Sequence, residues 1–391
     1  MKGKLLCTLY AIFYALFCSG QADSVKSHRS FFIEPEFLAG RIVPNYQQYP
    51  LSNVKETMAL DFGVSNIDNK PWAKYYNHPD LGVSLIFSQL GNENVFGNEI
   101  DLMPFISLNT TRRLKNTWFF KISIGASYFT KHWATNDSAN NAIGASYTWA
   151  FRVFLYRSLW VTKKTNLRIG GGYCHSSDGH TQLPNYGLNS ALLGLTLQFN
   201  TNPPDPDFVY PEKIKEEIPK TYFLTLRTGI GFHERGSPQG PIGGAKYGVG
   251  SAAISGGIIF KNHIKVRAGF TYRDYGKLLD YTGLNYTTWQ SSNIYFFLGC
   301  EFLIGHVGMD VEGGINLYKP FFHDFYKKYE GSTTSTFYYL KSIFPMRLGL
   351  NYYLINTSKN PLCNVFVGAN IDANFGQADF SELSLGTSFR L

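Results

Sequence analysis

The sequence predicts an all-β protein, an antiparallel transmembrane β-barrel. Many short segments alternate apolar residues with polar or small ones, as strands do when one face meets lipid and the other a polar interior. The 391 residues include 26 Tyr, 32 Phe and 38 Gly, while only 16% are charged. Beyond residue 22 no apolar run reaches the roughly 18 residues that a transmembrane helix needs. A soluble secreted sandwich would share the alternation but should carry more charge on its outward face.

Residues 1–22 are predicted to be a Sec-type secretory signal peptide. Lys2 and Lys4 precede an apolar run from Leu5 to Phe17, and small residues follow it. Removing this segment removes those two lysines and no acidic residue, so the formal charge falls from +8 to +6. A positive chain can bind nucleic acid, but an exported chain with scattered basic residues does not meet a genome. An anionic glycolipid surface is the better partner class.

The first half, residues 23–200, contains eight segments that alternate well enough to be strands. The sixth is the clearest, since Tyr147, Trp149 and Phe151 share one face with the other large apolar residues, and Ser146 and Thr148 lie on the opposite face. The eight expected strands are Phe31–Arg41, Glu56–Val64, Leu81–Gln89, Glu99–Leu108, Trp118–Phe129, Ile143–Leu155, Leu167–Ser177 and Asn189–Phe199. If the first strand rises from the periplasm, the loop after the seventh strand lies outside the cell. The long stretch Ser65–Asp80 does not fit the short periplasmic turns that this scheme predicts.

A change of composition separates the two halves. Residues 201–220 carry four Pro within the first eleven positions and then a charged tract, which is typical of a stiff, extended linker. Because turns within a barrel are normally short on the periplasmic side, this linker favours two tandem eight-stranded barrels. A single barrel of about sixteen strands is the alternative, since strand number alone does not separate the two.

Residues 221–391 form the second predicted barrel and again yield eight segments. They are Tyr222–Phe232, Tyr247–Phe260, Ile264–Tyr275, Asn293–Leu303, His306–Tyr318, Ser342–Ile355, Cys363–Phe375 and Phe380–Leu391. The closing hairpin is as regular as the last hairpin of the first half but lacks its His and Ser. This half therefore shows no recognisable site.

The candidate catalytic residues lie in the hairpin Leu167–Phe199. His175 and Ser177 fall on its apolar face, and side chains two residues apart on a strand lie about 6.6–7 Å apart. A serine hydroxyl needs a base to become a nucleophile, and the base works better when a third group orients it. Asn189, which opens the next strand, can accept a hydrogen bond from His175 but brings no full charge. It can equally be an ordinary turn residue.

The same hairpin resembles the outer-membrane lipid A 3-O-deacylase (PagL) family. The resemblance rests on His175 and Ser177 followed by Pro184, Asn185 and Gly187 at the family's spacing. It implies a serine hydrolase with Ser177 as nucleophile and His175 as base, and an oxyanion site formed by Asn185 and the backbone around Asp178 and Gly179. Two residues depart from the family pattern, since Asp178 stands where the family has Asn and Asn189 where it has the triad Glu.

The resemblance thus implies a carboxylic ester hydrolase that removes an acyl chain from lipid A in the outer membrane of a Gram-negative bacterium. The substrate would be lipid A, or lipopolysaccharide, of the outer leaflet, and the chemistry needs no cofactor. His180 lies nearby, but no Cys, Asp or His stands at ligand spacing, so no metal site is expected. The alternative is a non-catalytic barrel, such as a pore, an adhesin or a structural protein. The sequence fixes neither the ester that is cut nor the oligomeric state.

Overall fold

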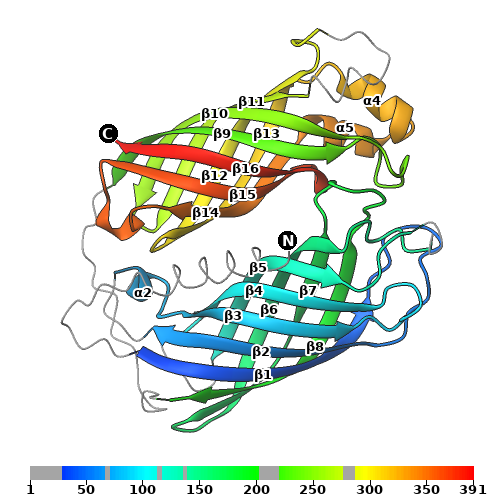
Figure 1. The fold of residues 1–391 in the computed structure, drawn as a ribbon. Coiled ribbons are helices and arrows are strands. Elements are labelled where there is room, and N and C mark those ends of the chain that lie inside the picture. The colour runs from blue at the N-terminus through cyan, green and yellow to red at the C-terminus, as the bar shows by residue number, and fades with distance from the viewer. Residues whose placement is uncertain (1–28, 67–70, 112–116, 135–138, 202–219, 276–286) are drawn as a thin grey trace, which may run out of the picture.

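In the computed structural model, the chain forms two closed antiparallel barrels of eight strands each (Figure 1). The structure describes residues 29–66, 71–111, 117–134, 139–201, 220–275 and 287–391. Strand β1 pairs with β8, and β9 pairs with β16, so each barrel closes without the other. The tandem prediction is confirmed and the sixteen-stranded alternative is wrong. The predicted signal peptide and all but the ends of the predicted linker lie outside the described residues.

The strands of both barrels are long enough to cross a membrane. The first barrel consists of β1 Arg29–Ile42, β2 Lys55–Asn66, β3 Asp80–Gln89, β4 Asn98–Asn109, β5 Trp118–Phe129, β6 Tyr147–Val161, β7 Thr165–Ser177 and β8 Leu188–Asn200. The second consists of β9 Thr221–Glu234, β10 Lys246–Phe260, β11 Ile264–Asp274, β12 Ser292–Ile304, β13 Val307–Tyr318, β14 Pro345–Tyr353, β15 Cys363–Asn374 and β16 Gln377–Arg390. Transmembrane strands need about 9–11 residues, a length that these strands reach.

Strand β1 shows how the alternation specifies a barrel in lipid. Phe31, Ile33 and Phe37 point outward and are exposed, whereas Glu34 and Glu36 point into the lumen and are buried. This arrangement is the reverse of a soluble sandwich, because the solvent of the outer face is hydrocarbon. None of the helices among the described residues has the length and hydropathy needed to span a bilayer.

Ion pairs fill the lumen of the first barrel. Lys121 Nζ donates to Glu36 at 2.6 Å and also to Asp61, and Arg152 donates to Glu36 at 3.1 Å. The carboxylates of Glu34, Glu36 and Asp61 are the only described group close enough together to hold a metal ion. Lys121 already pairs with Glu36 and Asp61, and Arg168 pairs with Glu34, so this cluster is an ion-pair network.

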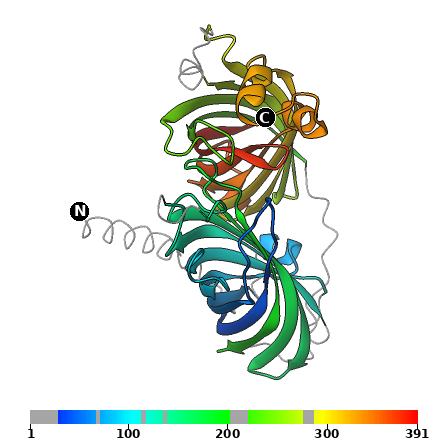
Figure 2. The ribbon, with the colours of Figure 1, turned by 90° about the vertical axis from the view of Figure 1, so that its right-hand side faces the viewer.

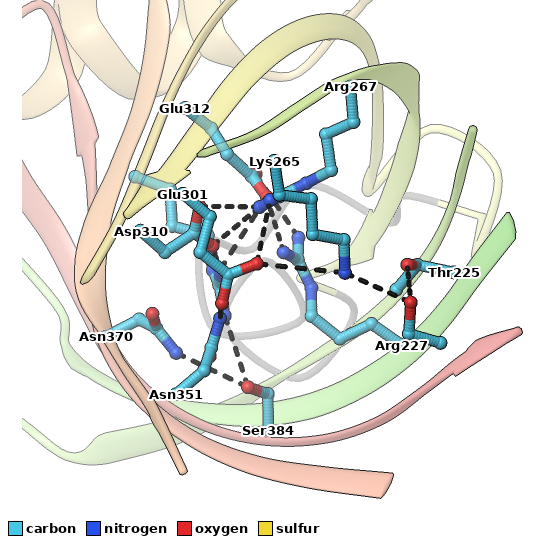
Figure 3. Close-up of polar contacts among 12 residues, drawn as sticks. Thr225, Arg227, Lys265, Arg267, Glu301, Asp310, Glu312, Asn351, Asn370 and Ser384 are labelled. Atoms are coloured by element: carbon cyan, nitrogen blue, oxygen red, sulfur yellow. Dashed lines mark hydrogen bonds and ion pairs between the residues drawn. The ribbon is translucent and has the colours of Figure 1, made fainter. Parts of the chain in front are cut away.

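The lumen of the second barrel is closed by a denser network of the same kind. Figure 3 shows Arg267 of β11 reaching Glu301 of the adjacent strand β12 and Asp310 and Glu312 of β13. Arg227 donates to Glu312 at 2.6 Å. The free space among these side chains is about 10 Å³, which is about the room needed by one water molecule. These residues leave no channel for a solute at this level of the barrel.

Two segments differ from the sequence prediction. Ile143 was expected to begin the sixth strand but lies in the preceding loop, where it packs against Phe96, Phe129 and Leu188. Residues Ser342 and Ile343 belong to helix α5 Thr336–Ile343, whose first turn is capped by the Ser335 hydroxyl, and not to β14. The other short helices are α2 Pro71–Tyr75, α4 Phe322–Tyr329 and the 3-10 turn Thr357–Lys359. Ile143 continues the apolar pattern because it is buried in the loop core over the barrel mouth, whereas helix α5 buries none of its side chains.

The two barrels lie side by side with corresponding ends together, as Figures 1 and 2 show from two directions. We call the end that carries the loops after odd-numbered strands the loop end, and the opposite end the turn end. At the turn end, helix α2 brings Tyr76 to the second barrel, where its hydroxyl donates to His263 O at 2.9 Å. This contact gives a role to the long connection between β2 and β3.

Candidate active site

The predicted catalytic side chains lie on the outer wall of the first barrel, at its loop end. His175 and Ser177 end strand β7 and share its outward face. Ser176, between them, points into the lumen and donates to Glu99 at 2.5 Å. Across the sheet, His175 lies opposite Asn189 of β8, and Ser177 lies opposite Trp149 of β6. The period of two therefore places the pair on the face that meets the membrane.

His175 is oriented by Asn189. The Nδ1 atom of His175 lies 2.7 Å from the side-chain oxygen of Asn189. An amide oxygen only accepts, so Nδ1 carries the proton and the lone pair is on Nε2. The Tyr173 hydroxyl donates to the same oxygen at 2.7 Å, which fixes the Asn189 side chain. This is the tautomer that a general base needs.

Hydrogen-bond donors converge on Ser177. The side-chain nitrogen of Asn185 donates to Ser177 Oγ at 3.0 Å, and the backbone N–H of Gly179 donates to it at 3.4 Å. The N–H of Asp178 points instead to the side-chain oxygen of Asn185, at 3.4 Å. Donors held around a nucleophile form the kind of site that stabilises an oxyanion.

His175 and Ser177 themselves share a face without a hydrogen bond. None joins the imidazole to the hydroxyl among the contacts of the described residues, and the Ser177 hydroxyl is hydrogen-bonded to Asn185 instead. Ser177 is only 6% exposed, under the loop that follows it. Below the pair the wall is apolar and open, with Leu193 72% exposed and Tyr173 42% exposed. Catalytic hydrogen bonds are often loose in the free enzyme and shorten when substrate binds.

The residues from strand β2 to strand β8 match a known family. Residues 61–198 fit the family described as "Lipid A 3-O-deacylase (PagL)". The first barrel is thus similar to the PagL family over these residues. The match includes the whole site and ends two residues before the end of β8, whereas the second barrel lies outside it. The PagL resemblance read from the hairpin is therefore confirmed.

Comparisons with solved structures find other outer-membrane proteins. Omp33 of Acinetobacter baumannii is 10% identical over 93% of this chain and 98% of its own, with a TM-score of 0.14. An outer membrane channel from Pseudomonas putida F1 is 7% identical over 96% and 98%, with a TM-score of 0.19. OprB of Pseudomonas putida is 7% identical over 93% of each chain, with a TM-score of 0.16. Scores this low carry no inference about function. No curated protein matches the chain.

The two departures from the PagL pattern have different structural consequences. Asn189, which stands where the resemblance leads one to expect a Glu, contacts His175 through its side-chain oxygen, so it supplies orientation without charge. The carboxyl group of Asp178 is buried in the loop above Ser177, and burial raises its pKa to about 7, although backbone groups of residues 180–182 act in the opposite direction. A neutral Asp178 does not repel an oxyanion, whereas an ionised one does.

His180 belongs to the same loop, but its side chain contacts the second barrel. Its ring stacks on His233 of the second barrel with 4.4 Å between centroids. Burial, together with His233, lowers the pKa of His180 to about 3. His180 is therefore neutral at physiological pH, and its Nε2 contacts Gly236 O at 3.2 Å.

Sequence reasoning missed Tyr173 and Trp149, which help to build this site, whereas Gly187 was already part of the sequence motif. Tyr173 holds the Asn189 side chain by a hydrogen bond. Its position two residues before His175, on the same face of the strand, could have indicated that it belongs to the site. Trp149 lies beside Ser177, which only the β6–β7 register reveals. Gly187 has φ of +74°, and a Cβ there would lie 2.7 Å from the His175 ring. Only glycine allows the loop to lie this close to the imidazole ring of His175.

Proposed function

We propose that this protein removes an ester-linked acyl chain from lipid A by a Ser-His mechanism. The observation that carries the proposal is the convergence of Asn185 and Gly179 on Ser177 beside an oriented His175, at the outward rim of the PagL-like first barrel. The substrate is lipid A, or lipopolysaccharide, in the outer leaflet. We further propose that residues 1–22 direct Sec-type export.

The reaction proceeds in two halves on the same serine. His175 Nε2 takes the proton of Ser177 as Oγ attacks the ester carbonyl, and the oxyanion binds Asn185 Nδ2 and the Gly179 N–H. Collapse breaks the bond to the sugar oxygen, which receives the proton from His175. Water, deprotonated by His175, then attacks the acyl-enzyme. The bond to Ser177 Oγ breaks, Oγ takes the proton back from His175, and the fatty acid is released. Asn189 keeps the imidazole in place through both halves.

The membrane-facing position of the site agrees with this substrate. A His and a Ser on the lipid face of a barrel are costly unless they serve a function. Acyl chains of the outer leaflet lie along the same apolar wall, which includes Tyr173 and Leu193, and so reach His175 from below. The pore alternative is weakened by the ion pairs that fill both lumens.

The direct test is chemical. The full chain is expressed in outer membranes and lipid A is analysed by mass spectrometry against membranes from cells with an empty vector. We expect lipid A lighter by one acyl chain and an equal amount of free fatty acid. Purified protein should also be labelled at Ser177 by a fluorophosphonate, which reacts with activated serines. Unchanged lipid A and no labelling would favour a non-catalytic barrel.

The pH dependence of the reaction should report Asp178. Its pKa of about 7 lies above that of an ordinary carboxyl, so the group is neutral below pH 7 and becomes ionised above it. Since the anion would lie beside the developing oxyanion, we expect deacylation to be about tenfold slower at high pH than near pH 6. The measurement is kcat against pH in detergent micelles.

Asp178→Asn is the matched variant for this prediction. It restores the residue of the PagL pattern and cannot ionise, so the decline above pH 7 should shrink to about twofold or less. An unchanged decline in Asp178→Asn would assign the pH dependence to another group.

A further inference from the structure

The loop that carries the oxyanion donors is held by the second barrel. Residues 178–187 lie against the β9–β10 loop and the start of β16 at the loop end of the molecule. Asn185 N donates to Pro238 O at 2.9 Å, and Leu183 N donates to the Glu234 carboxylate at 2.8 Å. Glu234 N in turn donates to His180 O at 3.0 Å. Three hydrogen bonds thus fix the backbone of a loop that belongs to the other barrel.

Glu234 connects the two loops. One carboxylate oxygen accepts from Leu183 N, and the other accepts from Gly244 N of its own barrel at 2.8 Å. The carboxylate is buried, and charged acceptors make stronger hydrogen bonds to backbone N–H groups than neutral ones do. The loop of one barrel is therefore tied to the loop of the other through a single side chain.

A second contact lies on the other side of Ser177. Ser381 of β16 accepts a hydrogen bond from Trp149 Nε1 at 3.0 Å and donates to Asp178 O at 3.4 Å. The approach is close, because a Cβ on Gly179 would lie 2.2 Å from Ser381 Oγ. Gly179 supplies one of the two donors to Ser177, so its N–H is also held from the second barrel.

We propose that the second barrel is an intramolecular clamp that positions the oxyanion loop, with Glu234 and Ser381 as positioning residues. The inference rests on the proposed deacylase function. It assigns a role to the second barrel, which lies outside the family match. Oxyanion donors act only when they are held before the charge develops, and an exposed loop is mobile unless something fixes it. The clamp fixes Asn185 and Gly179 without touching the substrate.

Other features of the second barrel agree with this task. Its lumen is closed by ion pairs, so it is not built as a channel. Its closing hairpin turns tightly between β15 and β16, which leaves the start of β16 free to meet Trp149. The contact of Tyr76 with His263 at the turn end gives a second point of attachment and sets the relative orientation of the barrels.

The test uses full-length variants in micelles with lipid A as substrate. Glu234→Ala should lower kcat about 10- to 100-fold, because misplacing a catalytic group by about 1 Å has effects of this size, and KM should change by less than about twofold. Glu234→Gln retains an acceptor for Leu183 N and should recover most of the activity. Ser381→Ala, which removes a smaller side chain, should lower kcat about two- to fivefold.

Glu330→Gln is the control. Glu330 also lies at the loop end of the second barrel, where it accepts from Lys341 at 2.6 Å, and its side-chain contacts are within that barrel. Its replacement should leave kcat within about twofold. An equal loss in Glu330→Gln, or wild-type kcat in both Glu234→Ala and Ser381→Ala, would overturn the clamp.

Hydrogen exchange tests the clamp apart from the activity. The amides of Leu183 and Asn185 should be protected in the wild type and exchange at least about tenfold faster in Glu234→Ala, because both are bonded to the second barrel. If the wild type does not deacylate lipid A, the proposed function fails while this exchange still decides whether the loop is held. Unchanged exchange in Glu234→Ala would refute the clamp even in an active enzyme.

Discussion

Ser177→Ala is expected to lower kcat for lipid A deacylation by about 10³-fold or more, the loss that follows removal of a serine nucleophile. The donors Asn185 and Gly179 remain, so the variant should still bind substrate with a similar KM. The hydroxyl makes its hydrogen bonds only within the site loop, and the barrel should fold normally. Fatty acid release in micelles measures the loss.

Ser176→Ala provides the matched control for Ser177→Ala. Ser176 is the adjacent serine on the same strand, but it faces the lumen and donates to Glu99. Its loss should reduce the free energy of unfolding by about 1 kcal/mol and leave kcat within about threefold. Equal activity loss in both variants would mean that the strand end, and not the Ser177 hydroxyl, is what matters. Full activity in Ser177→Ala would exclude it as nucleophile.

The barrel architecture was predictable because lipid imposes a strict rule on each strand. In β5, Trp118 and Tyr128 lie on the outward face and are exposed, whereas Lys121 and Ser123 are buried in the lumen. A one-residue slip would exchange these faces, so the alternation also indicates which residues face lipid. The number of barrels followed from the composition of residues 201–220, since a long linker is not expected inside a barrel.

What the alternation did not predict are the segments that cap the barrel. Ile143 continues the apolar pattern of β6 but packs into the loop core with Phe96 and Leu188. Residues of helix α5 likewise alternate locally, and only the cap at Ser335 marks the helix start. Periodicity describes a face, and it does not say whether that face meets lipid or another loop.

The site was predictable where its residues are close in sequence. His175 and Ser177 were placed on one face by their spacing, and the hairpin brought Asn189 opposite His175. The contribution of Glu234 and Ser381 could not be predicted, because both lie in another barrel and meet the loop only through tertiary packing. No local pattern in either residue's strand indicates such a contact.

Arg267→Met should destabilise the second barrel by about 3–5 kcal/mol, the cost of removing one partner from a buried ion network. Arg267 donates to Asp310 at 2.6 Å, to Glu312 at 2.8 Å and to Glu301 at 3.3 Å (Figure 3). Methionine fills much of the same space but leaves these carboxylates with too few cations. Urea unfolding in detergent micelles, followed by intrinsic fluorescence, measures the change.

A second substitution separates charge imbalance from lost packing. Adding Asp310→Asn to Arg267→Met removes the excess negative charge and should recover part of the loss, since neighbouring sites in one network are not additive. Arg390→Met is the surface control, because the exposed Arg390 guanidinium donates to Asn360 O at 2.8 Å, and its loss should cost less than about 0.5 kcal/mol. If Arg267→Met cost no more than Arg390→Met, the lumen would be hydrated and its ion pairs would not hold the barrel together. The ion pairs would then no longer indicate that the lumen of the second barrel is closed. The role of this barrel at the site would rest on its contacts with the loop alone.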